Sequence, residues 1–239
     1  MGEKNFRGQL VLGLCIGMGL VLLGLILGHN ALGIKKLERV VTVKGLAERE
    51  VPADIALWPL TFTDAADDLG ELYRSLDSNT EKVVAFLLDH GFTRDEVTIS
   101  PPSITDKLAQ QYGGNGRVAL RFTATQTVTV YTEKVDRVRT ALTEVKDLGK
   151  AGIVIRGDNY DNRTEYFFTG LNEIKPEMIE EATRNAREVA EKFARDSHSS
   201  VGKIKRATQG RFSISDRDQN NPHIKKVRVV STVVYYLAD

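Results

Sequence analysis

The sequence predicts an α+β fold with a largely antiparallel sheet and helices on one face, preceded by one N-terminal transmembrane helix. Three observations lead to this prediction. Residues 10–28 consist only of apolar residues and glycine. After residue 40, segments rich in Val and Thr come in pairs that could form hairpins. Three segments with apolar residues at helical spacing interleave with those pairs, which is typical of a sheet covered by helices on one side.

The N-terminal apolar run, residues 10–28, is long enough to cross a membrane. Roughly 19 residues at about 1.5 Å each span close to the ~30 Å hydrocarbon core of a bilayer. Lys4 and Arg7 precede the run, as they would in an anchor or a signal peptide. The run is longer than the apolar region of a typical signal peptide, and no small-x-small cleavage site follows it. We expect an uncleaved anchor, with a short cytoplasmic tail at 1–9 and a juxtamembrane linker at 29–39.

Four glycines of this run share one face of a helix. They are separated by 4, 7 and 4 residues, so at about 100° per residue they fall within an arc of roughly 60°. Two small-xxx-small pairs in line let membrane helices approach closely, although glycine is common in membrane helices in any case. The predicted helix-packing residues are Gly13, Gly17, Gly24 and Gly28.

Charge and cysteine content narrow the class of protein. The chain has a formal net charge of +1, and the part after residue 39 is close to −2, so no global positive charge attracts nucleic acid. The only cysteine, Cys15, lies in the apolar run, so no disulfide can form within one chain. Lys and Arg residues flank the run on both sides, and their count does not settle its orientation.

The domain expected at 40–239 begins with two predicted strands. Val40–Leu46 and Ile55–Thr63 are rich in β-branched and aromatic residues. Gly45 interrupts the first strand and suggests a bulge. In the second, the pair Trp58-Pro59 indicates an edge position or a bulge, because proline donates no ladder hydrogen bond.

A helix and two further strands should follow. Asp68 and Glu71 have the spacing of a capping box, and Gly91 is typical of a helix end. The apolar stripe between them is Leu69, Leu72, Leu76, Val83 and Leu87. Strands are then predicted at Val97–Thr105 and Val118–Tyr131, around a polar loop at 110–116.

The last third of the chain predicts two helices and a closing hairpin. Thr132 should cap a helix whose apolar face is Val135, Val138, Leu142 and Val145. Extended pieces follow at Ile153–Ile155 and Tyr160–Phe168. Pro176 suits the first turn of a long helix whose stripe is Ile179, Ala182, Ala186, Val189 and Phe193. The hairpin consists of Lys203–Ser215 and Lys226–Leu237, joined by Asp216–Pro222.

No pattern in the sequence points to catalysis or metal binding. None of the four histidines has a His or Cys partner at metal-ligand spacing. No nucleophile elbow or phosphate-binding loop is found. The acidic clusters near Asp68 and Glu177 lie in first helical turns, where carboxylates interact favourably with the helix dipole. We expect no enzymatic activity, no metal and no cofactor.

Basic residues gather in the C-terminal hairpin, where only Asp216 and Asp218 oppose them. Such an excess could contact an anionic ligand. Lys226 and Arg228 also alternate with valines, which is typical of a half-buried strand with a solvated face. The candidate contacts are Lys203, Lys205, Arg206, Arg211, Lys225, Lys226 and Arg228.

The final predicted strand is apolar on both faces. Val229, Val233, Tyr235 and Leu237 alternate with a second set, Val230, Val234 and Tyr236. A sheet covered by helices on one side would expose the second set. Val230, Val234 and Tyr236 are therefore the candidate oligomer interface, with burial of a central strand inside one chain as the alternative.

The order of several segments resembles the SIMPL-domain family of bacterial envelope proteins. These segments are Val41–Gly45 followed by Pro52-Ala53-Asp54, the alanine-rich stretch Glu181–Ala194 with its exit at Val201–Ile204, Gln209–Ser215, and Val227–Leu237. The resemblance covers about 200 residues. It implies an exported or envelope-anchored protein that forms ring-like homo-oligomers and is linked to stress tolerance. The family has no agreed catalytic residues, so the resemblance transfers no site.

The predicted function is a non-enzymatic, membrane-anchored envelope protein that self-assembles into a ring or cage, linked to envelope or oxidative stress tolerance. Its partners would be membrane lipid and further copies of itself, without nucleic acid. The resemblance places it in the bacterial inner membrane, single-pass, with the domain in the periplasm or outside the cell. The alternative is a periplasmic binding module that captures an anionic or peptide ligand through the basic hairpin.

Overall fold

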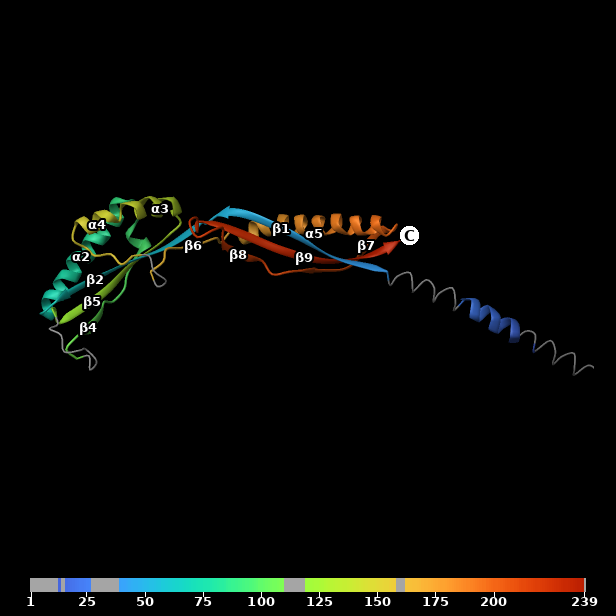
Figure 1. The fold of residues 1–239 in the computed structure, drawn as a ribbon, viewed down its shortest axis with the longest axis horizontal. Helices are drawn as coiled ribbons and strands as arrows, with labels where there is room; N and C mark the ends of the chain where they lie inside the picture. The colour runs from blue at the N-terminus through green and yellow to red at the C-terminus, as the bar shows by residue number, and fades with distance from the viewer. Residues whose placement is uncertain (1–12, 14–15, 27–38, 110–118, 158–161, 239) are drawn as a thin grey trace, which may run out of the picture. The chain divides into compact units, whose positions relative to one another are not determined.

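The computed structural model describes residues 13, 16–26, 39–109, 119–157 and 162–238. They divide into two compact units. Unit 1 comprises the chain up to Glu48, Lys175–Phe212 and the residues from Arg228 onward. Unit 2 comprises Arg49–Ile174 and Ser213–Val227. Antiparallel strands and helices make up the described part (Figure 1), which confirms the mixed architecture, but they form two sheets where one was predicted.

In the apolar N-terminal run, residues 16–26 are helical. The large apolar side chains of this helix are each more than half exposed. Within the described residues, we find no helix that combines the length and the apolar character needed to cross a membrane. The run predicted as an anchor begins at residue 10 and ends at residue 28, so several of its residues lie outside the described part.

The sheet of unit 2 has the strand order β3-β5-β2-β6, and β4 also pairs with β5. Its strands are β2 (Ile55–Ala66), β3 (Val97–Ile99), β4 (Ser103–Asp106), β5 (Phe122–Thr132) and β6 (Glu165–Phe167). The single strand predicted over 97–105 is wrong, because Pro101 and Pro102 separate β3 from β4 and neither can donate a ladder hydrogen bond. The loop predicted at 110–116 lies outside the described residues.

Pro59 lies inside β2 without a bulge, since β2 and β5 pair in one continuous antiparallel register. On its other side, β2 pairs with β6 only over Ile55–Leu57. The next contact on that side is a single bridge between Phe62 and Ile155. Pro59 therefore occupies a stretch of β2 with no ladder partner on one side. The predicted edge position is confirmed for this stretch, and the predicted bulge is wrong.

The helices of unit 2 lie on one side of its sheet (Figure 1). They are α2 (Leu69–Asp89), α3 (Val135–Glu144) and α4 (Lys146–Lys150), with a short 3₁₀ turn, η1 (Arg94–Glu96). As predicted, the Asp68 carboxylate accepts the N–H of Glu71 at 2.9 Å, and Gly91 follows α2 with φ +81°. Leu69 is 41% exposed, so the predicted stripe is wrong at its first residue. Helix α4 has only five residues, too few to show the apolar spacing from which a helix is predicted.

The second sheet has the order β1-β9-β7, with β8 pairing with β9. Its strands are β1 (Val40–Pro52), β7 (Ser200–Gln209), β8 (Ser213–Asp216) and β9 (Ile224–Ala238). The predicted strand over 203–215 is divided at Gly210. That residue donates its N–H to the Val230 carbonyl at 2.9 Å, and a Cβ there would lie 2.4 Å from the same oxygen.

Helix α5 (Leu171–Asp196) begins five residues before Pro176, the residue predicted in its first turn. The helix starts earlier than predicted because another segment supplies a hydrogen-bond acceptor for the residues just before it. The Asp54 carboxylate accepts the N–H groups of Thr169 at 2.8 Å and Gly170 at 3.1 Å, and the Thr169 hydroxyl at 2.9 Å. Donors at the start of a helix need such an acceptor, and no local sequence pattern reveals one that lies over a hundred positions away.

In unit 1, α5 runs along the sheet (Figure 1) and buries small side chains against it. The buried residues recur every fourth position: Met178, Ala182, Ala186, Ala190 and Ala194. Phe193, predicted in this stripe, is 55% exposed. A Cβ at Gly45 would lie 1.8 Å from the Ala182 carbonyl oxygen. Gly45 is thus required by the close approach of α5, and β1 continues through it without the predicted interruption.

Candidate functional site

The sheet of unit 1 has two faces of different character. On one face, Val43, Val233 and Tyr235 are buried with Ala186 and Ala190 of α5. The alternate residues of β1 and β9 point to the opposite face, because successive side chains of a strand alternate. We call this opposite face the outer face. Its apolar residues are Val40, Leu46, Val230, Val234 and Tyr236.

The apolar side chains of the outer face are accessible. Val40 and Leu46 are 37% and 41% exposed, and Val230, Val234 and Tyr236 are half-buried. The separation of the two sets in β9 follows the predicted alternation: Val233 and Tyr235 are buried with α5 and Val229 is buried, whereas Val230, Val234 and Tyr236 are only half-buried. Whether the outer face binds another subunit stays a prediction.

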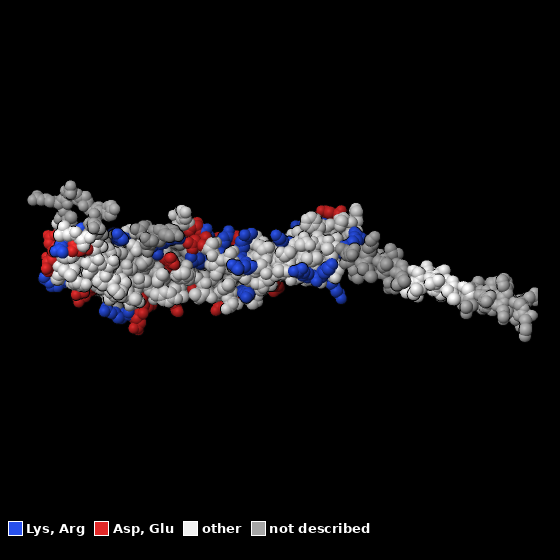
Figure 2. All heavy atoms as spheres, turned by 90° about the horizontal axis from the view of Figure 1, so that it is seen from below, with Lys and Arg blue, Asp and Glu red and all other residues white. Residues whose placement is uncertain are grey.

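Cations border the outer face. The Lys205 ammonium lies 5.4 Å from the centre of the Tyr236 ring, within the range of a cation–π contact. The Arg228 guanidinium lies 3.9 Å from the Glu48 carboxylate, a partly exposed pair of small energetic value. Strand β7, which also carries Lys203 and Arg206, is exposed over most of its length. On the face drawn in Figure 2, Lys and Arg side chains form small groups, some of them beside Asp and Glu, with uncharged surface between the groups.

The seven basic residues predicted as one anion-binding set are divided between the units. Lys203, Lys205, Arg206, Arg211 and Arg228 belong to unit 1, and Lys225 and Lys226 to unit 2. Lys225 is only 7% exposed and forms an ion pair with Asp216. Asp216 also accepts from Arg163 at 2.9 Å. Lys225 is not available as a ligand contact, because its charge is buried and already paired with Asp216.

Three of the four glycines predicted to pack membrane helices lie among the described residues, and none of the three has a close neighbour outside its own helix. A Cβ built at Gly13, Gly17 or Gly24 has no other atom within 4 Å. Gly28 lies outside the described residues. The three described glycines are thus accessible to another molecule, and self-association of this helix stays a prediction.

The shifted titratable groups of unit 2 hold structural elements together. Burial lowers the pKa of His90, but the Phe86 carbonyl and the Glu144 carboxylate raise it by more, so the net shift is upward. Burial raises the pKa of Glu96, whereas the Lys134 ammonium at 2.8 Å and hydroxyl donors lower it to about 2. Among the described residues, no three His, Cys, Asp or Glu side chains come together as metal ligands would.

Sequence reasoning missed the structural roles of two residues in the segments that resemble a family. Gly45 permits the contact of β1 with α5, and Asp54 holds the residues before α5. A lone glycine in a strand is a usable signal for close backbone approach. The role of Asp54 depends on a long-range contact and has no comparable signal.

Comparison with protein-family models gives a match over residues 41–234, to a family described as "SIMPL: Protein of unknown function (DUF541)". The search of curated proteins finds no match. The matched range covers most of the chain; it begins where the segment order noted in the sequence begins and ends within the last of those segments, Val227–Leu237. The chain therefore belongs to the SIMPL family.

Proposed function

We propose that this chain is a membrane-anchored, non-enzymatic envelope protein that self-assembles into a homo-oligomer, a ring or cage, and serves in envelope or oxidative stress tolerance. The outer face of the unit 1 sheet is the observation that carries the proposal. Its apolar side chains remain accessible in one copy of the chain, while Val43, Val233 and Tyr235 on the other face of the same strands are buried with α5. Accessible apolar side chains gathered on one face of a sheet are typical of interaction sites.

The edges of the same sheet support assembly. In the order β1-β9-β7, the edge strands among the described residues are β1 and β7. An edge strand presents unpaired N–H and C=O groups that another chain can complete. If β7 of one copy met β1 of the next, the contact would join two different surfaces, and repetition of such a contact closes a ring when the rotation permits.

The N-terminal segment supports a membrane location. Large apolar side chains in residues 16–26 are 53–66% exposed, and lipid would cover them at little cost. Residues flanking this helix extend the uncharged run to a length that matches a bilayer. Tethering to one membrane would also raise the effective concentration of the subunits and so favour weak contacts between them.

Light scattering on the purified full chain in detergent tests the assembly. We expect an oligomer at micromolar concentration for the natural sequence. The double substitution Val230→Glu and Val234→Glu should yield monomers, because burying two unpaired carboxylates in an interface costs several kcal/mol. Thr98→Glu, on the exposed strand β3 of unit 2, adds a carboxylate at another strand surface and should leave the oligomer intact.

Two results would contradict the proposal. One is a monomeric natural chain at micromolar concentration. The other is an intact oligomer in the doubly substituted chain while its circular dichroism shows a native fold. For the anchor, recovery of a mature soluble form from cells that lacks about the first thirty residues would overturn the membrane assignment.

A further inference from the structure

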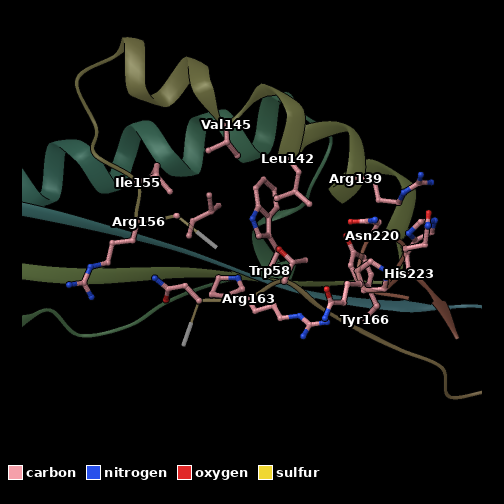
Figure 3. Close-up of a pocket in the computed structure, with 18 residues that line it drawn as sticks. Trp58, Arg139, Leu142, Val145, Ile155, Arg156, Arg163, Tyr166, Asn220 and His223 are labelled. Carbon is pink, nitrogen blue, oxygen red and sulfur yellow. The ribbon is translucent and has the colours of Figure 1, made fainter. Parts of the chain in front are cut away.

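A pocket of about 620 Å³ opens beside the Trp58-Pro59 pair of β2. Its walls come from β2, from α3, from the residues around Ile155, from the segment that leads into β6, and from the loop at 219–223 (Figure 3). All of these residues belong to unit 2. The volume is within the usual range for pockets that bind small molecules.

The pocket exists because β2 lacks a ladder partner at this point. The Thr61 carbonyl accepts the Arg156 N–H at 2.7 Å on the side of β2 away from β5. Polar backbone groups of a strand alternate in direction, so Pro59, two residues earlier, turns its nitrogen to the same side. Proline has no N–H to offer there. The side of β2 away from β5 can therefore stay without a partner strand at Pro59, because this residue has no N–H group that would need an acceptor.

The inner wall of the pocket is apolar and rigid. Trp58 is 2% exposed and packs edge-on against Phe92, with ring centroids 6.2 Å apart. Leu142, which belongs to α3, and Val145, the residue that follows α3, lie beside the indole in Figure 3. In the part of the chain that the structure describes, the indole N–H has no hydrogen-bond acceptor. The indole nitrogen is not among the fully buried atoms that lack a partner, so it is accessible to an acceptor that a ligand in the pocket supplies.

The rim of the pocket is cationic. Three arginines line it, Arg139, Arg156 and Arg163, with the imidazole of His223 beside them, and the described lining residues include no Asp or Glu. Figure 3 shows the three arginines on different sides of the pocket, with Arg139 and Arg156 at opposite ends. Arg139 is paired with Asp136 at 3.0 Å and Arg163 with Asp216 at 2.9 Å. Arg156 has no ion pair among the described residues.

The loop at one end of the pocket is held in shape by a single carboxylate. Asp218 accepts the backbone N–H groups of Asn220 and Asn221, both at 2.9 Å. Arg217, at 2.9 Å, together with these donors lowers the pKa of Asp218 to about 2. His223 follows in the same loop, and burial and the nearby Arg139 and Arg217 lower its pKa. Asp136 and Asp218 act in the opposite direction, and the net shift of the His223 pKa is downward.

We propose that this pocket binds a small organic anion with an apolar body, such as a carboxylic acid with a short hydrocarbon or aromatic part. The apolar body would lie against Trp58, Leu142 and Val145. The carboxylate would lie at the rim, where an arginine can donate two parallel hydrogen bonds to it. This site is separate from the outer face and does not depend on self-assembly.

The single tryptophan of the chain makes the test direct. The full chain in nanodiscs is titrated with 3-phenylpropionate, and Trp58 fluorescence is excited where the phenyl ring does not absorb. We expect a saturable change. The neutral amide of nearly the same shape, 3-phenylpropanamide, should bind at least about tenfold more weakly, because a charge-assisted hydrogen bond contributes at least about one factor of ten.

Two variants locate the anion and the apolar body. Arg139→Gln combined with Arg156→Gln should weaken binding of the acid at least about tenfold and leave binding of the amide unchanged. Leu142→Ala should weaken both compounds, because it shortens the shared apolar wall. The matched control is Lys150→Gln, an exposed cation of unit 2 whose partner is Asp147; it should change acid binding by less than about twofold.

Three results would overturn the proposal: no saturable fluorescence change with the acid, equal affinities for the acid and the amide, or as large a loss with Lys150→Gln as with the double arginine variant. The last would mean that only the general charge of the surface attracts the acid. Because both arginines are at the surface of the rim, native circular dichroism of the double variant is expected and separates lost binding from lost folding.

Discussion

Replacing Gly45 by alanine tests how tightly β1 and α5 are packed. A Cβ at this position would lie 1.8 Å from the Ala182 carbonyl oxygen, 2.5 Å from the Ala186 nitrogen and 2.9 Å from the Ala186 Cβ. Two of these atoms belong to the helix backbone, so no side-chain rotation can relieve the overlap. The helix must move by about 1.5 Å to restore an ordinary contact distance.

That movement would weaken the core of unit 1. A gap of 0.5–1 Å already loses about a quarter to a half of a dispersion contact. The residues affected include Val43, Val233 and Tyr235, whose side chains are buried against α5. Losing about half of the burial energy of three such side chains amounts to about 3–4 kcal/mol, at the upper limit of ordinary overpacking.

Urea unfolding of residues 40–239, followed by circular dichroism, measures this effect. Gly45→Ala should lower the free energy of unfolding by about 3 kcal/mol or more. Gly149→Ala is the matched control, because Gly149 lies in helix α4 and a Cβ there meets nothing within 4 Å. It should raise stability by about 0.5–1 kcal/mol. If Gly45→Ala stays within about 0.5 kcal/mol of the natural chain, the packing argument is wrong.

Three further outcomes are expected. Asp54→Ala should destabilise the fold by about 1–2 kcal/mol, measured by urea unfolding, because the donors before α5 lose their acceptor; no change would refute that role. Both ring nitrogens of His90 face acceptors, the Phe86 carbonyl at 2.6 Å and Glu144 at 2.8 Å, and only the imidazolium can donate to both. Folding thus raises the pKa of His90, and the stabilisation it provides is complete below pH 6.5 and lost as the pH rises through the raised value. His90→Gln should therefore destabilise the chain more at pH 5.5 than at pH 8.5 in thermal unfolding, and an equal effect at both would contradict this account. For Glu96, whose pKa in the fold is about 2, the sign is opposite: its contribution exists above the ordinary value and disappears as the pH falls toward 2. Glu96→Gln should cost about 1–2 kcal/mol at pH 7 and much less near pH 2, as followed by Trp58 fluorescence.

Local patterns predicted the elements better than their contacts. The start of α2 at Asp68 and its end before Gly91 follow from residues within one turn of each boundary, and both predictions are confirmed. The start of α5 could not be found in this way, because its acceptor, Asp54, is distant in sequence. Likewise, Phe193 has helical spacing to Val189 but is exposed, because the buried row of α5 passes through every fourth residue from Met178 to Ala194 and so lies beside Phe193.

The candidate surfaces were predicted in part. Strand alternation alone separates Val230 and Val234 from the residues under α5, because a period of two fixes the face of every residue. The division of the basic residues could not be predicted, since burial of Lys225 depends on Asp216 across a turn. The pocket was not predicted, because Trp58-Pro59 indicated only an edge position or a bulge. The rim is assembled from four separate segments, and no linear pattern joins them.

The alanine stripe of α5 has a consequence for how the helix finds its place on the sheet. Four identical methyl groups at intervals of four residues look the same after a shift of one helical turn, so they cannot by themselves define where the helix stops along the strands. Gly45 breaks this degeneracy, because only at one axial position does the bare backbone of β1 face Ala182 and Ala186. Met178, the one large side chain in the row, marks its first position, so the two residues together select a single alignment among several that would otherwise be nearly equal in energy.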